Sequence, residues 1–124
     1  MTAMTLNFAE HAQTTRFTHG HEDVVDLLGT SIGLQTFEPG WRWSNDVRPL
    51  VGTERCPFVH LGYMLSGQLH VELPDGGTLD LHTGDVFSIP PRHDAWVVGD
   101  ETVRLLDWGG KAKEYAQPAA RSAG

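Results

Sequence analysis

Residues 68–81 read Gln-Leu-His-Val-Glu-Leu-Pro-Asp-Gly-Gly-Thr-Leu-Asp-Leu, and this stretch decides the fold. Up to residue 73 it alternates, so that Leu69, Val71 and Leu73 face one way and the polar residues between them face the other. Residues 74–77 supply a tight turn, because glycine adopts positive φ without steric cost. Residues 78–81 then return with the same alternation. The pattern predicts an antiparallel hairpin with one buried face.

Short apolar runs between glycines and prolines continue this pattern on both sides of the hairpin. Strands are predicted at Val24–Leu28, Ser31–Glu38, Val59–Ser66, Gln68–Leu73, Thr78–Leu81, Asp85–Ile89, Ala95–Val98 and Thr102–Trp108. No segment sustains the period of about 3.6 residues that marks an amphipathic helix. Short strands at intervals of about 8–12 residues, separated by turn signals, predict an all-β sandwich or barrel.

The chain has 124 residues, which is the size of one ordinary domain. Residues 1–20 are polar and lack a period, so we expect a loose arm or one edge strand there. The barrel is expected to span residues 21–108. Residues 109–124 are expected to form a flexible tail.

The charge balance limits the partners that the protein can have. Sixteen acidic residues outnumber nine basic ones, giving a net charge of −7. Nucleic acids and anionic membranes are therefore not expected as partners, because phosphate binding needs clustered Lys and Arg. A local basic lining from Arg42, Arg48 or Arg92 would still suit an anionic ligand. The single cysteine, Cys56, permits no internal disulfide, which is usual in a reducing compartment. The sequence shows neither an apolar signal peptide nor a membrane span, so we expect a cytoplasmic protein.

Two motifs in the second half of the chain resemble those of the cupin superfamily. Residues 63–67, Tyr-Met-Leu-Ser-Gly, resemble the strand and turn that end the first cupin motif. Residues 84–91, Gly-Asp-Val-Phe-Ser-Ile-Pro-Pro, resemble the opening of the second. With residues 37–44 before them, the resemblance covers about residues 31–108 and is greatest to small single-domain bacterial cupins. It implies a double-stranded β-helix (jelly-roll) barrel with one small-molecule pocket.

The metal ligands of the first cupin motif are replaced in this chain. Counting back from Gly67 places His60 at the position of the family's glutamate. Cys56 and Glu54 then fall on its two histidine positions, and Arg48 falls on its first glycine. The family's metal site therefore does not carry over unchanged.

The second motif also departs from the family. It keeps its opening glycine and its proline, but Arg92, Ala95 and Gly99 stand where the family has glycine, histidine and asparagine. His93 lies two residues before the histidine position. In the geometry that the resemblance implies, His93 and the first motif face each other across the barrel.

Cys56, His60 and His93 are the candidate metal ligands. Cys56 and His60 share a face on extended backbone, but a straight strand would hold them about 13 Å apart. A bend is therefore required, and Pro57 is a plausible place for it. A thiolate with two imidazoles suits Zn²⁺, Cu or Fe(II). The expected cofactor is one divalent transition metal ion (Zn, Fe, Cu, Ni or Mn), and a barrel without metal is the alternative.

Aromatic residues and one acid complete the expected pocket. Trp43, Tyr63 and Trp96 are assigned to its wall, with Glu54 nearby, because pockets combine apolar walls with a few polar groups. The same tryptophans would equally suit a core or a dimer interface.

Two functions are open for such a barrel. The first is a small cupin that binds a polar or anionic small molecule, as a metal-dependent enzyme of the dioxygenase, isomerase or lyase type. The alternative is a non-catalytic module that binds or senses a small molecule or a metal. A scaffold whose function lies in its oligomer surface ranks third. We also expect a homodimer, because short barrels expose strand edges and an apolar sheet face.

Overall fold

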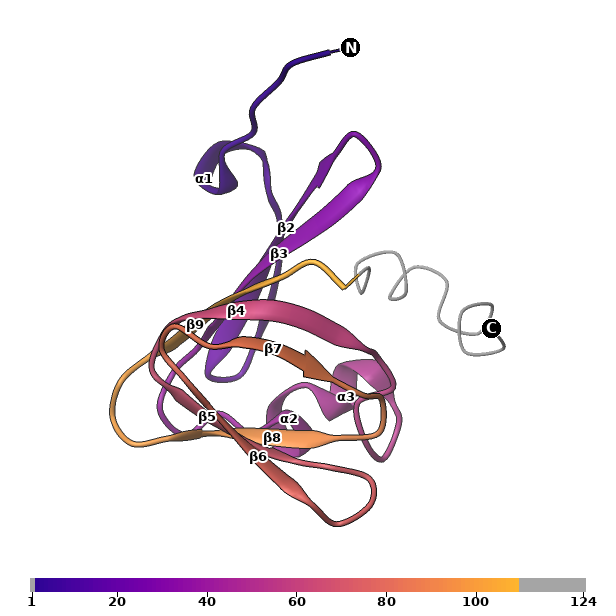
Figure 1. Ribbon diagram of the computed structural model, residues 1–124, viewed down its shortest axis with the longest axis vertical. Coiled ribbons are helices and arrows are strands. Elements are labelled where there is room, and N and C mark those ends of the chain that lie inside the picture. Colours follow the sequence, from indigo (N-terminus) through magenta and orange to yellow (C-terminus); the bar gives the residue numbers. More distant parts are fainter. Residues whose placement is uncertain (1, 110–124) are drawn as a thin grey trace.

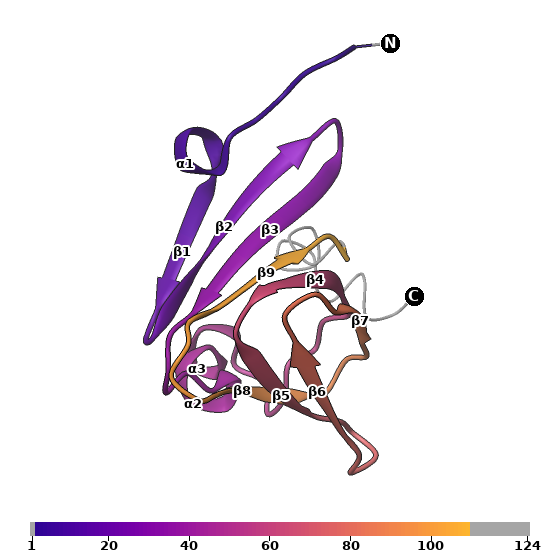
Figure 2. The ribbon, with the colours of Figure 1, turned by 60° about the vertical axis from the view of Figure 1, so that its left-hand side comes forward.

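The computed structural model describes residues 2–109, and these form two antiparallel sheets that close around one core (Figures 1 and 2). The elements in chain order are α1 (Phe8–His11), β1 (Gln13–Phe17), β2 (Gly20–Leu27), β3 (Thr30–Phe37), α2 (Trp43–Asp46), α3 (Arg48–Val51), β4 (His60–Ser66), β5 (Gln68–Glu72), β6 (Thr78–His82), β7 (Val86–Ile89), β8 (Asp94–Val98) and β9 (Val103–Asp107). All eight predicted strands are present. The all-β fold class is therefore confirmed.

The larger sheet has the strand order β1-β2-β3-β9-β4-β7, and the smaller one has the order β6-β5-β8. Every pairing within them is antiparallel. The hairpin that opened the sequence analysis is β5–β6, with Leu69 opposite Leu81 and Val71 opposite Leu79. Its turn closes between Leu73 and Gly77, and Gly76 has a positive φ of 90°.

The core lies between the two sheets and follows the alternation of the strands. β9 turns Val103 and Leu105 inward, and β5 turns Leu69 and Val71 inward against them. Gly62 on β4 is required by close packing, since a Cβ there would lie 2.1 Å from the Leu106 carbonyl oxygen. The strands β4 and β9 thus approach each other more closely than a side chain at position 62 would allow.

The polar N-terminal segment forms the outer edge of the larger sheet. β1 pairs only with β2 among the residues described, and α1 precedes it. Figure 2 shows that the far end of the β2–β3 hairpin extends away from the smaller sheet. Beyond Gly109, the tail expected at residues 109–124 lies outside the described residues.

Two one-turn helices that the sequence did not predict connect β3 with β4. α2 begins after Arg42, whose backbone N–H donates to the Asp46 carboxylate at 3.0 Å. α3 has Pro49 in its first turn and ends at Gly52, which adopts the left-handed conformation. α2 packs against β8 and α3 packs against α2, at one end of the barrel (Figure 1). No helix among residues 2–109 is long and apolar enough to cross a membrane.

Candidate metal centre

A short backbone bridge between two loops positions the first pair of candidate ligands. The Cys56 N–H donates to the His93 carbonyl at 2.9 Å, and the Arg92 N–H donates to the Cys56 carbonyl at 2.5 Å. Arg92 has a positive φ of 66°, which turns the chain just before His93. The bridge makes Cys56 and His93 neighbours, although they lie far apart in the sequence.

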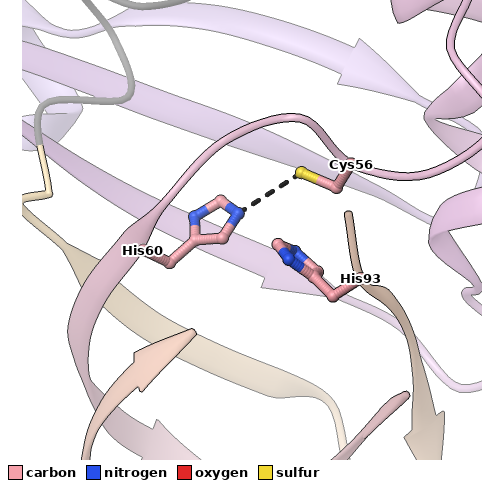
Figure 3. Close-up of side chains that lie close together, drawn as sticks. All are labelled: Cys56, His60 and His93. Carbon is pink, nitrogen blue, oxygen red and sulfur yellow. Dashed lines mark hydrogen bonds between the residues drawn. The ribbon is translucent and has the colours of Figure 1, made fainter. Parts of the chain in front are cut away.

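His60 reaches the same place because the chain leaves the extended conformation between Cys56 and β4. Residues 57–59 belong to no strand, and His60 is the first residue of β4. The Cys56 Sγ lies 3.4 Å from the His60 Nε2 (Figure 3). The bend that the sequence required at Pro57 thus replaces the separation of about 13 Å on a straight strand with direct contact.

The three candidate ligands form one cluster at the wall of the barrel. One ligand atom from each of Cys56, His60 and His93 lies within 4.8 Å of the other two. The two imidazole rings stand edge to face with their centroids 4.9 Å apart. Cys56 and His93 are buried, and the His60 side chain is nearly so. Figure 3 shows the three side chains converging from two segments of the chain.

Each imidazole is held by a hydrogen bond at its Nδ1 atom, so its Nε2 atom is the nitrogen available to bind a metal ion. The His93 Nδ1 lies 2.6 Å from the Pro90 carbonyl oxygen, an acceptor, so Nδ1 carries the proton and donates it. The His60 Nδ1 lies 2.5 Å from the Asp107 carboxylate and donates in the same way. Histidine ligands of metals are commonly oriented like this, with the second nitrogen on a carbonyl or carboxylate. The donor set therefore fits a transition metal ion.

Asp107 is the buried residue that holds His60 in place, and 1% of its surface is exposed. Its Oδ2 also accepts a hydrogen bond from Gln35 at 3.4 Å, and its Oδ1 accepts one from the Gly109 N–H at 3.1 Å. A buried carboxylate is stable only when its oxygens are hydrogen-bonded and its charge is paired. His60 supplies the pairing here.

The close contacts shift the protonation of Cys56 and His60 in opposite directions. Burial by itself raises the pKa of the Cys56 thiol, but hydrogen bonds to both histidines and their charge lower that pKa from 9.0 to about 6. Burial lowers the pKa of His60, whereas its hydrogen bonds to Asp107 and Cys56, with their charges, raise that pKa from 6.5 to about 10. Near neutral pH the metal-free pair is therefore a thiolate beside an imidazolium.

The cluster opens onto a cavity of about 450 Å³ inside the barrel. This volume falls within the range of about 300–1,000 Å³ that is usual for small-molecule pockets. Its wall is mostly aromatic and aliphatic, and Cys56, His60, His93 and Asp107 form a polar region on it. The arrangement has the composition of a binding pocket, because a few convergent polar groups stand in an apolar wall.

The structure brings together the three candidate ligands that the sequence selected, and it places Trp43 on the cavity wall. The other three expected pocket residues were assigned wrongly, since Glu54, Tyr63 and Trp96 do not line the cavity. Glu54 is exposed and forms an ion pair with Arg48 at 3.1 Å. It is therefore a surface residue and not part of the cavity wall.

The two aromatic errors follow from strand alternation. On β4, Gly62 and Met64 face inward, so Tyr63 between them faces outward and is 36% exposed. On β8, Ala95 and Val97 face inward, so Trp96 packs on the outer side. Its ring lies there under the Arg42 guanidinium at 4.3 Å and beside His70.

The basic lining considered for an anionic ligand is not found around the cavity. Arg42 binds the buried Asp94 at 3.1 Å, and Arg48 binds Glu54. Neither of them, nor Arg92, is among the residues that line the cavity. The expectation of an anionic ligand therefore has no support from the charges of the wall.

Sequence reasoning missed Asp107 and Trp41, although each had a usable signal. Asp107 continues the inward alternation of Val103 and Leu105, and an acid on an apolar face indicates a buried partner. Trp41 shares its side of the chain with Trp43 and lines the same cavity. Glu22 is buried in β2 and also lines the cavity.

Comparisons with known proteins agree with this architecture. The family described as the cupin domain matches residues 54–109, a range that contains all three candidate ligands and Asp107. A search of curated proteins gives no match.

Solved structures with a similar fold share little sequence with this chain. The polyketide cyclase RemF from Streptomyces resistomycificus has a TM-score of 0.59 at 16% identity, covering 86% of this chain and 78% of its own. A Klebsiella pneumoniae protein with a double-stranded beta-helix domain has a TM-score of 0.55 at 16% identity, covering 85% and 84%. A Vibrio parahaemolyticus protein of unknown function has a TM-score of 0.58 at 12% identity, covering 78% and 97%.

These similarities establish the fold alone. The chemistry of the site has to be inferred from the residues of this chain. The two antiparallel sheets, the motif match and the neighbours agree on one architecture. The chain folds as a double-stranded β-helix barrel, and its residues 54–109 match the family model of the cupin domain.

Proposed function

We propose that this cupin binds one divalent transition metal ion through Cys56, His60 and His93 and presents it to a small organic molecule in the barrel. The observation that carries the proposal is the convergence of one thiol and two imidazoles within 4.8 Å on the cavity wall. Three protein ligands leave one position of a tetrahedral ion for water or substrate, which is the arrangement of catalytic zinc sites.

The metals that best suit this donor set are Zn²⁺, Cu and Fe(II), because all three accept thiolate and imidazole. The ion would supply Lewis acidity to a molecule bound in the cavity. The residues of the chain would hold it, with Asp107 and the Pro90 carbonyl fixing the orientation of the two imidazoles. The surrounding apolar wall would limit access of bulk water.

Elemental analysis of untagged protein, purified without added metal, tests the proposal directly. We expect about one equivalent of a transition metal per chain, and its loss in the Cys56→Ser and His93→Ala variants. His70→Ala is the matched control, because His70 lies on the outer face of the smaller sheet and pairs with Asp80 at 2.7 Å. Metal-free wild-type protein that also binds no Zn²⁺, Cu or Fe(II) in titrations would contradict the proposal.

A second function has its own support in the same cluster. The Cys56 Sγ, the His60 imidazole and the Asp107 carboxylate form a chain of contacts at 3.4 Å and 2.5 Å. This is the order of a nucleophile, a base and the group that orients the base. We propose covalent thiol catalysis as the alternative to metal binding.

Reaction with a thiol reagent separates the two functions. If Cys56 holds a metal in the purified protein, then iodoacetamide should react slowly until a chelator removes the ion. If Cys56 is a free nucleophile, then the reaction should be fast and the chelator should not change it. A fast, chelator-insensitive reaction together with an absence of metal would favour the thiol enzyme.

A further inference from the structure

Most of the exposed large apolar side chains gather around β4 in the larger sheet. Ten such side chains are exposed among residues 2–109, and six of them lie on β4 or on segments next to it. We call these six residues the β4 face: Val59, Leu61, Tyr63, Leu65, Val86 and Trp108. Single exposed apolar residues are ordinary on a protein surface, whereas a contiguous group marks an interaction site.

The register of the strands makes the β4 face continuous. β4 turns every second residue from Leu61 to Leu65 outward, and each of these is exposed. Tyr63 in the middle stands opposite Val86 on β7 and opposite Leu106 on β9. Side chains that stand opposite each other in an antiparallel pair have Cβ atoms about 4.5–5.5 Å apart, so they touch. The apolar residues of three neighbouring strands therefore form one surface.

Charged residues stand around the β4 face and not within it. The six residues are uncharged, and so is Leu106 between them, although the chain as a whole carries a net charge of −7. Arg104 is exposed two residues before Leu106, and the exposed Asp85 directly precedes β7. An apolar centre with a charged and polar rim is the usual anatomy of a protein–protein interface.

The size of the β4 face matches one half of a symmetric dimer. Its six residues are between 36% and 74% exposed, which leaves about 400–500 Å² of apolar surface in water. A standard interface buries about 800 Å² per partner, of which about 450–500 Å² is non-polar. In a two-fold dimer the same patch contacts itself, so an uncharged apolar face is self-complementary. A face for a different protein would be expected to carry charges that complement that partner.

The edges of the larger sheet are less suited to pairing with a second copy than its face. β7, at one edge, has only four residues and is followed directly by Pro90. A short edge strand that ends at a proline resists the addition of a further strand. β1, at the other edge, exposes four of its five residues, and all four are polar.

We propose that the β4 face is the interface of a symmetric homodimer, in which the larger sheets of two copies pack face to face. This inference does not rest on the proposed function, because the β4 face and the cavity lie on opposite sides of the same strands. β4 turns His60 toward the cavity and Leu61 away from it, and β9 does the same with Asp107 and Leu106. Failure to bind a metal would therefore leave the interface standing.

Val86→Asp tests the interface, since Val86 is the most exposed residue of the β4 face at 74%. An aspartate at this position stays hydrated in a monomer. In the dimer it would lose water without a counter-charge, and the symmetry would impose that cost twice. In sedimentation equilibrium of the full chain, we expect a wild-type dimer at tens of micromolar and association about 100-fold weaker in the variant.

Leu28→Asp is the matched control, because Leu28 is 67% exposed in the turn between β2 and β3 and is not part of the β4 face. This variant should associate like the wild type. Leu61→Ser removes an apolar side chain from the face without adding a charge, and it should weaken association by about 10-fold. Circular dichroism establishes that each variant is folded.

Three results would overturn the inference. A dimer that persists in both Val86→Asp and Leu61→Ser would place the interface elsewhere. Equal dissociation in Leu28→Asp would mean that added charge, and not the β4 face, controls association. A wild-type monomer would leave the face to residues 110–124 or to a different protein.

Discussion

Replacing His60 by glutamine should raise the pKa of Cys56 in the metal-free protein by about 1–3 units, the usual effect of removing one opposite charge in contact. In the wild type the pKa of the Cys56 thiol is about 6. At pH 7 about nine-tenths of the thiol is therefore ionised, against about one-hundredth for a thiol with a pKa of 9.0. The variant loses the charge and the hydrogen bond of His60 but keeps those of His93, so that burial, which opposes the thiolate, is offset by one histidine instead of two. The pKa of Cys56 should then lie between about 7 and 9.

The measurement is the pH dependence of alkylation in the presence of a chelator. Cys56 is the only cysteine in the chain, so the signal comes from one thiol. The midpoint of the profile is compared, and not the rate, because a thiolate of lower pKa is also intrinsically less nucleophilic. We expect a midpoint near pH 6 in the wild type and in the control His70→Gln.

Two results would refute the reasoning. A wild-type midpoint of about 9 or higher would mean that His60 and His93 do not outweigh burial at Cys56. An unchanged midpoint in His60→Gln would mean that the contact between Sγ and Nε2 does not exist in solution. Either result would also weaken the case for thiol catalysis.

Three further predictions concern metal affinity, packing and assembly. Cys56→Ser and His60→Ala should each lower the affinity for the proposed metal by about 10-fold or more. Wild-type binding should weaken as the pH falls below about 10, because protons compete for the His60 imidazole, and more steeply below about 6, where they also compete for the Cys56 thiolate; calorimetric titration checks both effects. Gly62→Ala should destabilise the fold by about 1–3 kcal/mol in urea denaturation, since its Cβ would meet the Leu106 oxygen at 2.1 Å; an unchanged midpoint would contradict the packing of β4 on β9. We also propose that the protein is a homodimer, so light scattering at tens of micromolar should give about twice 13.7 kDa, and a monomer would refute this.

The sequence by itself determined the strands and the turns, because these depend on neighbours along the chain. The alternation at residues 68–73 predicts β5, and the glycines after it predict the hairpin to β6. Motif register was enough to select Cys56, His60 and His93 together. The requirement for a bend near Pro57 also followed from the length of an extended residue.

Only the tertiary structure decided what surrounds those three residues. β1 is polar and is held by backbone pairing with β2, so its sequence carries no alternating apolar signal. The partnership of His60 with Asp107 joins residues 47 positions apart through the pairing of β4 with β9. The inward face of each strand is likewise set by its partners, which is why Tyr63 and Trp96 were placed on the wrong side. Local patterns fix the period of a strand, whereas its orientation toward the cavity depends on contacts between segments far apart in the chain.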